Sequence, residues 1–212
     1  MKNLHFLIAA LFFTLLLSGC SNKDLLDATK SGNIEGVKKA LKKGANINTV
    51  DNNGYSALML ATDKGYLNIV KFLLENYADT NIRNNYNRKA LMRASSTGNI
   101  EIVKLLIAKN ADIHARNDFG TTPLLIAAKY GHAKVVELLI QKGADINAKG
   151  NDGFNALMLS LLNGHFEISK FLITHGIDVK AKNNDGYTSL KFAKGNNQRE
   201  IYEILKKAGA QE

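Results

Sequence analysis

The sequence of 212 residues contains no tryptophan, one proline and one cysteine. A single cysteine excludes a disulfide within the chain. Without low-complexity or proline-rich linker segments, nothing in the sequence marks a second domain. The chain also lacks a glycine-rich phosphate loop, a serine nucleophile motif and a paired-carboxylate motif. These absences argue against an enzyme, and we expect no catalytic residue, no metal site and no cofactor.

Long apolar runs are also missing. The longest stretch, residues 6–17, has 12 residues; it follows Lys2 and leads into Leu17-Ser18-Gly19-Cys20. A membrane-anchor helix is the alternative interpretation, but a bilayer span needs about 20 apolar residues. A basic start, a short apolar stretch and small residues at its end predict a cleaved secretory signal over residues 1–19.

The tetrapeptide that ends at Cys20 resembles the lipoprotein box of bacteria. The resemblance implies cleavage before Cys20 and lipidation of this residue. Ser21 after the cysteine is typical of lipoproteins sorted to the outer membrane, so we expect a lipid-anchored protein of the bacterial cell envelope, facing the periplasm. Residues 20–23 would form a tether that keeps the folded domain, residues 24–212, within about 15 Å of the lipid.

A 33-residue unit repeats through the rest of the chain without insertion or deletion. The fourth copy shows the pattern most fully, with Thr122-Pro123-Leu124, an alanine pair, Gly131-His132 and a run of valine and leucine residues. Threonine and proline suit the start of a helix, and Gly131 and Gly143 suit the ends of two successive helices. A fixed period of this kind indicates a stack of similar units, each packed on its neighbours. The six approximate units are residues 24–50, 51–83, 84–116, 117–149, 150–182 and 183–212.

These motifs resemble the ankyrin repeat. The resemblance implies an all-α solenoid of six helix-turn-helix units joined by projecting β-turn loops. It also implies a concave surface, formed by the loop tips and the ends of the inner helices, that binds protein partners. It implies no small-molecule substrate.

Several units depart from the usual pattern. The histidine that usually follows Pro-Leu is absent from units 2 to 6, where Met59, Met92, Leu125, Met158 and Lys191 take its place. We expect these methionines to pack in the core. His132 and His165 hold the usual Gly-His position, and we expect them to stabilise turns.

Units 2 and 3 depart furthest. Tyr77 and Asn110 replace the glycine that ends the second helix, Asn87 replaces a turn glycine, and Lys89 occupies a helix-capping position. Tyrosine in a left-handed conformation costs about 1 kcal/mol. We therefore expect units 2 and 3 to be the weakest part of the stack.

Two columns of equivalent residues are candidates for partner binding. Adjacent units lie roughly 10 Å apart, so each column forms a ladder on the surface. Aromatic and arginine residues dominate binding energy where water is excluded. The cationic column contains Arg83, Arg116, Lys149 and Lys182. The aromatic set contains Tyr55, Phe154 and Tyr187 after the turn, Tyr86 and Phe119 at the tips, and Tyr130 at the end of an inner helix. Arg88 occupies the same column after the turn and is counted with this set. The alternative is that the aromatic residues cover neighbouring turns and the charges are only solvated.

The formal net charge is +9 at pH 7. A basic surface favours an acidic partner, an anionic membrane face, or solubility alone. The first unit carries Lys38, Lys39, Lys42 and Lys43. They provide either the polar outer side that a terminal unit needs, or a contact with anionic headgroups near Cys20.

The leading hypothesis is a membrane-anchored adaptor or inhibitor that binds an envelope protein with an acidic patch. The alternative is a surface-exposed lipoprotein with a structural or host-interaction role. The export signal argues against a nucleic-acid partner.

Overall fold

The computed structural model describes residues 20–195 and 198–211. The predicted signal peptide, residues 1–19, lies outside them. The described part of the chain is an all-α solenoid, as expected, in which the only β-structure is isolated bridges such as Val50 with Ser56. Residues 20–30 are helical. The further helices are α2 (Ile34–Lys42), α3 (Ala57–Lys64), α4 (Leu67–Glu75), α5 (Ala90–Thr97), α6 (Ile100–Ala108), α7 (Pro123–Tyr130), α8 (Ala133–Gln141), α9 (Ala156–Leu162), α10 (Phe166–Thr174), α11 (Ser189–Gly195) and α12 (Arg199–Lys207).

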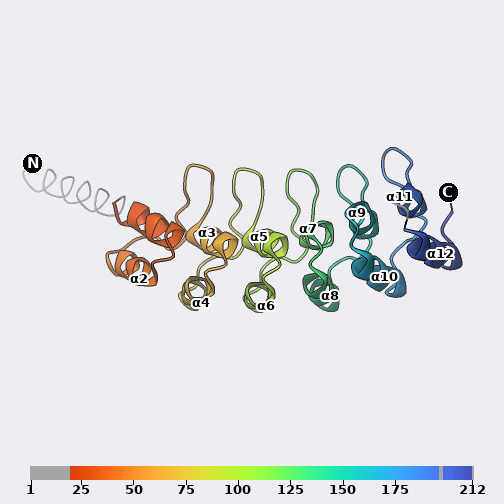
Figure 1. Ribbon diagram of the computed structural model, residues 1–212. Helices are drawn as coiled ribbons and strands as arrows, with labels where there is room; N and C mark the ends of the chain where they lie inside the picture. Colours follow the sequence, from red (N-terminus) through yellow and green to blue (C-terminus); the bar gives the residue numbers. More distant parts are fainter. Residues whose placement is uncertain (1–19, 196–197, 212) are drawn as a thin grey trace, which may run out of the picture.

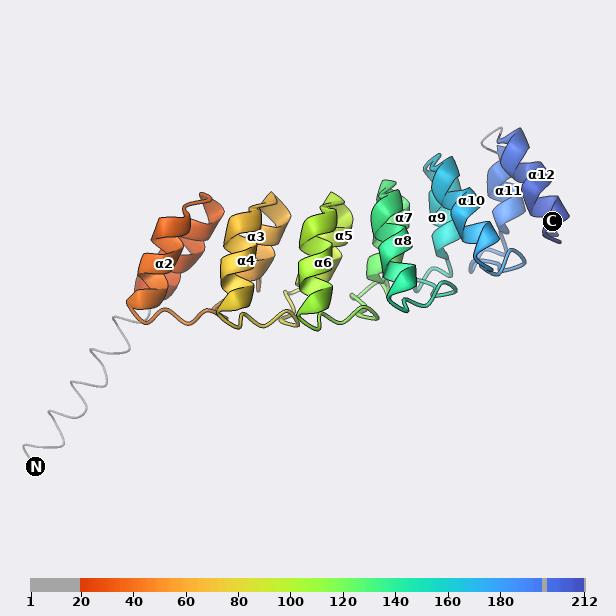
Figure 2. The same ribbon diagram turned by 90° about the horizontal axis from the view of Figure 1, so that it is seen from below.

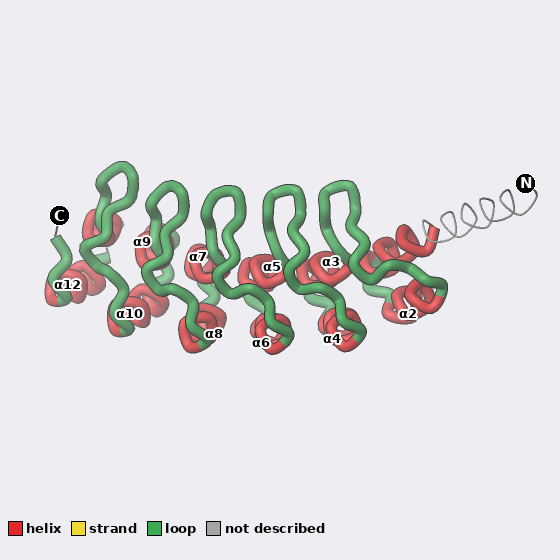
Figure 3. The backbone as a smooth tube through the Cα atoms, turned by 180° about the vertical axis from the view of Figure 1, so that it is seen from behind, coloured by secondary structure: helices red, strands yellow, loops and turns green. Residues whose placement is uncertain are grey.

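The helices form two parallel rows. Inner helices α3, α5, α7, α9 and α11 lie in one row, and outer helices α4, α6, α8, α10 and α12 lie in the other (Figure 1). A loop projects from each inner helix on the side away from the outer row, and Figure 3 shows these loops side by side. The helix pairs follow one another in chain order along the stack (Figure 2). The loops and the inner helices therefore enclose one long face of the solenoid.

Local sequence explains the helix boundaries. Thr122 caps α7, since its hydroxyl accepts a hydrogen bond from Leu125 N at 3.3 Å, and Pro123 occupies the first turn. Gly131, with φ of 80°, ends the helix in the left-handed region. Small buried residues such as Ala127 allow neighbouring helices to approach closely. The core is continuous from Leu25 to Leu205, so the described units share one hydrophobic core.

The substituted positions keep the backbone of the repeat. Tyr77, Asn87 and Asn110 have φ of 62°, 54° and 57°, in the left-handed region that the replaced glycines would adopt. Met59, Met92 and Met158 are buried, as predicted. The structure therefore shows strained backbone positions in units 2 and 3, while their lower stability stays a prediction.

Two ladders of hydrogen bonds join successive units. In the outer ladder, an asparagine side chain accepts a bond from the backbone N–H of an aspartate in the next unit, as Asn48 does from Asp79 at 2.9 Å. In the loop ladder, an asparagine Nδ2 donates to a carbonyl of the preceding loop, as Asn85 does to Asn52 at 3.1 Å. Such bonds satisfy backbone groups that the loops leave unpaired.

Both ladders change between units 3 and 4. His114 replaces the outer asparagine, and no described residue accepts a bond from Asp145 N. Asp118 replaces the loop asparagine and cannot donate, so Asn87 Nδ2 instead donates to the Asp118 carboxylate. The junction between units 3 and 4 thus differs in both ladders from its neighbours.

The structure corrects the expectation of a tether at residues 20–23. These residues belong to the first helix. Ser21 is buried and its hydroxyl donates to Lys43 O at 3.4 Å, while Asn22 Oδ1 accepts a bond from Asn46 N at 2.7 Å. The helical pattern continues to Cys20 because its side chains find partners in the loop after α2, so no slack separates Cys20 from the fold.

Candidate functional site

The loops and inner helices of units 3 to 5 enclose a groove. A hollow of about 360 Å³ lies between them. Four of the predicted partner-binding residues line it: Arg88, Phe119, Tyr130 and Phe154. The structure thus brings residues from three successive units to one surface, which we call the concave groove.

Aromatic side chains at the groove are open to solvent. Phe119 is 62% exposed and Tyr130 is 53% exposed. Tyr86, at the neighbouring loop tip, is 54% exposed. Large exposed aromatic side chains that lie together around a hollow are typical of a binding surface, because they bury much area at low entropic cost.

Cations border the aromatic rings. The Arg88 guanidinium lies 5.8 Å from the centroid of Tyr86, and Lys129 Nζ lies 5.8 Å from that of Tyr130. Arg93 also lines the hollow, and it pairs with Asp63 across the two units while lying 5.9 Å from the ring of Tyr55. Tyr55 is partly buried and lies beside the Arg93 side chain of the next unit.

The groove becomes apolar toward unit 6. The rings of Phe154 and Phe192 lie 5.4 Å apart, and those of Tyr187 and Phe192 lie 6.2 Å apart. Lys191 Nζ lies 3.6 Å from the centroid of Tyr187. Leu162 is exposed nearby on the end of α9. Positive charge, in contrast, is concentrated toward unit 3. Unit 3 (residues 84–116) contains six cations and two acids, whereas unit 5 (residues 150–182) contains three of each.

The cationic column does not line this hollow. Arg83, Arg116, Lys149 and Lys182 are exposed, but two of them bond to the next unit. Arg116 donates to Gly120 O at 2.9 Å and to Lys149 O at 2.7 Å, and Lys149 Nζ donates to Lys182 O at 3.1 Å. Arg116 and Lys149 thus also join neighbouring units, while the presentation of the four cations to a partner stays a prediction.

Sequence reasoning missed most of the groove residues, among them Arg93, Ile126, Lys129 and Leu159. Arg93, Ile126 and Leu159 are equivalent positions on the inner helices, and Phe192 continues the same column. The signal was present, since this column varies between units whereas the adjacent helix positions keep small or apolar core residues. Lys129 lies one helical turn after Ile126, on the same face of α7.

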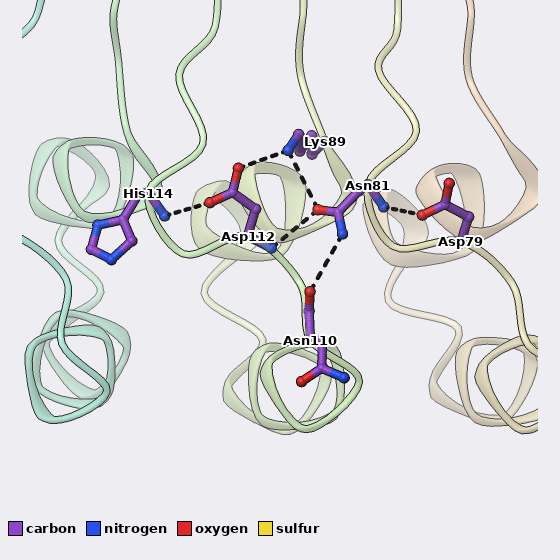
Figure 4. Close-up of polar contacts among 6 residues, drawn as sticks. All are labelled: Asp79, Asn81, Lys89, Asn110, Asp112 and His114. Atoms are coloured by element: carbon purple, nitrogen blue, oxygen red, sulfur yellow. Dashed lines mark hydrogen bonds and ion pairs between the residues drawn. The ribbon is translucent and has the colours of Figure 1, made fainter.

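A polar cluster replaces the usual cap of α5 (Figure 4). Lys89 occupies the capping position and makes no capping bond. Its buried side chain donates to Asp112 at 2.8 Å and to Asn81 at 3.4 Å. The hydrogen bond from Lys89 lowers the pKa of Asp112, and a backbone bond from His114 N adds to this effect. The cluster joins units 2 and 3 and lies outside the concave groove, so we interpret it as structural.

His132 and His165, which the sequence predicts to stabilise turns, bond to the preceding unit. The Nε2 of His132 lies 2.9 Å from Ser96 O, and that of His165 lies 3.0 Å from Lys129 O. Each imidazole therefore joins its own unit to the preceding inner helix. Among residues 20–195 and 198–211, no group of three or more His, Cys, Asp or Glu side chains is arranged to hold a metal ion.

Cys20 is the first residue that the structure describes. Its thiol is free and exposed, and the residue is helical. None of the described helices is both long and apolar enough to cross a bilayer.

Comparison with protein families gives a consistent result along the chain. Residues 25–117 and 79–150 match a family model described as ankyrin repeats in three copies. Residues 139–193 match a second model, described as ankyrin repeats in many copies. A search of curated proteins gave no match.

Proposed function

Because the chain belongs to the ankyrin repeat family, we propose that it is a membrane-anchored interaction protein whose concave groove binds another protein of the cell envelope. Proteins with these repeats are generally non-enzymatic interaction modules, and neither matching model describes a catalytic family. The protein acts as an adaptor, or as an inhibitor that masks its partner at the membrane.

The observation that carries this proposal is the clustering of exposed aromatic rings and cations around one hollow. Phe119, Tyr130 and Phe154 offer apolar area, and Arg88 and Lys129 offer positive charge beside it. Aromatic and arginine side chains in a desolvated pocket supply most of the energy of typical interfaces. The partner surface that complements them carries an apolar side chain flanked by carboxylates.

The membrane anchor is the second part of the proposal. It rests on the lipoprotein-like tetrapeptide at Cys20 and on the exposure of this residue at the edge of the fold. Burial of acyl chains contributes about 0.8 kcal/mol per CH₂, so several chains hold a protein on a membrane. Labelling of the full chain with an alkyne fatty acid in cells should mark the wild type and leave a Cys20→Ser variant blank. A blank wild type contradicts the anchor.

The binding surface is tested by matched charge reversals. A soluble chain of residues 20–212 with Cys20→Ser serves as bait for envelope extract. The variant Arg88→Glu/Lys129→Glu changes the groove, whereas Arg83→Glu/Lys182→Glu changes the cationic column by the same charge. We expect the specific partner to be lost from the first bait and retained by the second. Equal retention by both baits contradicts a groove-centred interface.

Orientation separates this function from the alternative of a surface-exposed lipoprotein. Protease treatment of intact cells should leave the chain uncut if it faces the periplasm, and digestion would favour the alternative. Digestion of the chain in broken cells under the same treatment is the control, because it shows that the protease can cut the chain.

A further inference from the structure

Among the described residues, none packs against the outer side of the first unit. In each later unit, one position of the outer helix holds a partly buried apolar residue that packs against the core. These residues are Phe72, Leu105, Leu138, Phe171 and Ile204. Lys38 Nζ lies 6.0 Å from the centroid of Phe72, which places this face of α4 against unit 1. The equivalent residue of unit 1 is Lys39, which is exposed and has no described unit in front of it.

The inner helix of unit 1 likewise has charged, exposed residues at positions that are buried in later units. At two adjacent positions, the residues of units 2 to 6 are buried. Unit 1 has Lys23 and Asp24 at these positions, and both are exposed. Lys43, also exposed, lies with its Nζ 3.8 Å from Asp24 Oδ2. Lys23, Asp24, Lys39 and Lys43 therefore form a basic end of the stack, which we call the N-terminal end face.

This basic character is not shared equally by the two ends. Residues 20–50 contain six cations and three acids, whereas residues 183–212 contain five cations and four acids. A polar cap needs charge of either sign, so a polar outer side alone does not account for the excess of lysine at the first unit.

Cys20 lies beside the N-terminal end face. It precedes Lys23 by less than one helical turn, and Ser21 is hydrogen-bonded to Lys43 O. With the first helix packed up to this point, an anchor at Cys20 brings the end face directly to the membrane surface. A flexible tether would not impose this placement.

We propose that the N-terminal end face binds the headgroups of an anionic phospholipid bilayer. Each lysine near an anionic surface strengthens binding by about fivefold, from a contribution of about 1 kcal/mol. Lys23, Lys39 and Lys43 together give an effect on the order of 100-fold. The solenoid then projects from the membrane by its first unit, and the groove of units 3 to 5 faces the surrounding solution. This orientation rests on the proposed anchor at Cys20, whereas the headgroup contact does not.

The test uses residues 20–212 with Cys20→Ser, so that no acyl chain contributes. Binding is measured by co-sedimentation with vesicles of phosphatidylcholine alone or mixed with phosphatidylglycerol. We expect binding to the mixed vesicles at low salt, and its loss as salt rises, because the Debye length falls to about 10 Å at 0.1 M. No preference for the anionic vesicles would overturn the proposal.

A matched pair of variants locates the contact. Lys23→Gln/Lys39→Gln/Lys43→Gln removes three charges from the end face. Lys109→Gln/Lys134→Gln/Lys142→Gln removes three exposed charges from units 3 and 4. We expect the first variant to lose most of the preference for anionic vesicles and the second to keep it, with both folded by circular dichroism. Equal losses would show that net charge alone is responsible and would overturn the proposal. Fatty-acid labelling of the full chain reports on the anchor separately, so either idea can fail without the other.

Discussion

Replacement of Tyr77 by glycine should increase the free energy of unfolding. Tyr77 has a left-handed φ of 62°, and its side chain is 88% exposed, so little buried area is lost with it. A left-handed conformation costs a residue with a Cβ about 1–2 kcal/mol. The greater freedom of glycine in the unfolded chain offsets about 0.5–1 kcal/mol of this gain. The net stabilisation should therefore lie in the range of about 0–1.5 kcal/mol, centred near 0.75 kcal/mol.

Two further variants separate backbone strain from loss of the tyrosine ring. Tyr77→Ala removes the ring but keeps the Cβ, so it should give no comparable gain. Asn110→Gly changes the equivalent position of unit 3, where φ is 57°, and it should gain less because asparagine tolerates this region.

Urea unfolding followed by far-ultraviolet circular dichroism measures the effect as a shift in midpoint at an unchanged slope. Because repeat arrays can unfold in parts, the comparison requires superimposable transition shapes. Equal gains from Tyr77→Ala and Tyr77→Gly would refute the argument from backbone strain, and so would a glycine variant no more stable than the wild type.

Three further predictions concern the contacts between units. His114→Asn should restore the acceptor for Asp145 N and raise stability by about 0.5–1.5 kcal/mol, measured by urea unfolding; no change would show that this N–H loses nothing by facing solvent. The lowered pKa of Asp112 means that its pairing with Lys89 stabilises the fold at pH values above the ordinary value of 3.8 and ceases to do so as the pH falls below it. Urea midpoints at neutral and acidic pH should therefore differ less in Asp112→Asn than in the wild type, and an identical pH dependence would contradict this role. His132→Ala should lose about 1–3 kcal/mol, since it leaves a carbonyl of the preceding helix without its imidazole donor; hydrogen exchange of the turn after α7 should rise in the same variant and stay unchanged if the imidazole is dispensable.

The repeat made most of the fold predictable from sequence. A helix-capping threonine, a proline in the first turn and a glycine after each of the two helices define the helices of one unit. The strict period predicts the same helices in the other units. Even substituted positions such as Tyr77 and Asn110 follow the period, because hydrogen bonds to the end of their own helix, such as Tyr77 N to Leu74 O, hold the turn there. The conformational preference of a single residue is overridden where the surrounding contacts favour one backbone conformation.

The site was less predictable because side-chain direction depends on more than column spacing. Arg116 and Lys149 belong to a regular cationic column, yet each reaches a carbonyl of the next unit. That outcome requires the exact offset between neighbouring loops, which the sequence does not state. Arg93 and Ile126 were overlooked because they lie on helices that also supply the core. The helical state of residues 20–23 depends on partners in a distant loop, such as Asn46 for Asn22.

The concave groove and the altered ladders occur at the same junction. The hollow is lined from Arg88 in unit 3 to Phe154 in unit 5, so a partner that fills it must span the junction between units 3 and 4. Here His114 supplies no acceptor to Asp145 N, and Asp118 supplies no donor to the loop ladder. Other contacts take the place of the ladder bonds at this junction, because Arg116 donates to Lys149 O at 2.7 Å and His132 Nε2 lies 2.9 Å from Ser96 O. A partner that binds only the closed stack stabilises it by a free energy that grows with the logarithm of its affinity. A partner in the concave groove therefore binds across a junction that is held by side-chain contacts between units 3 and 4.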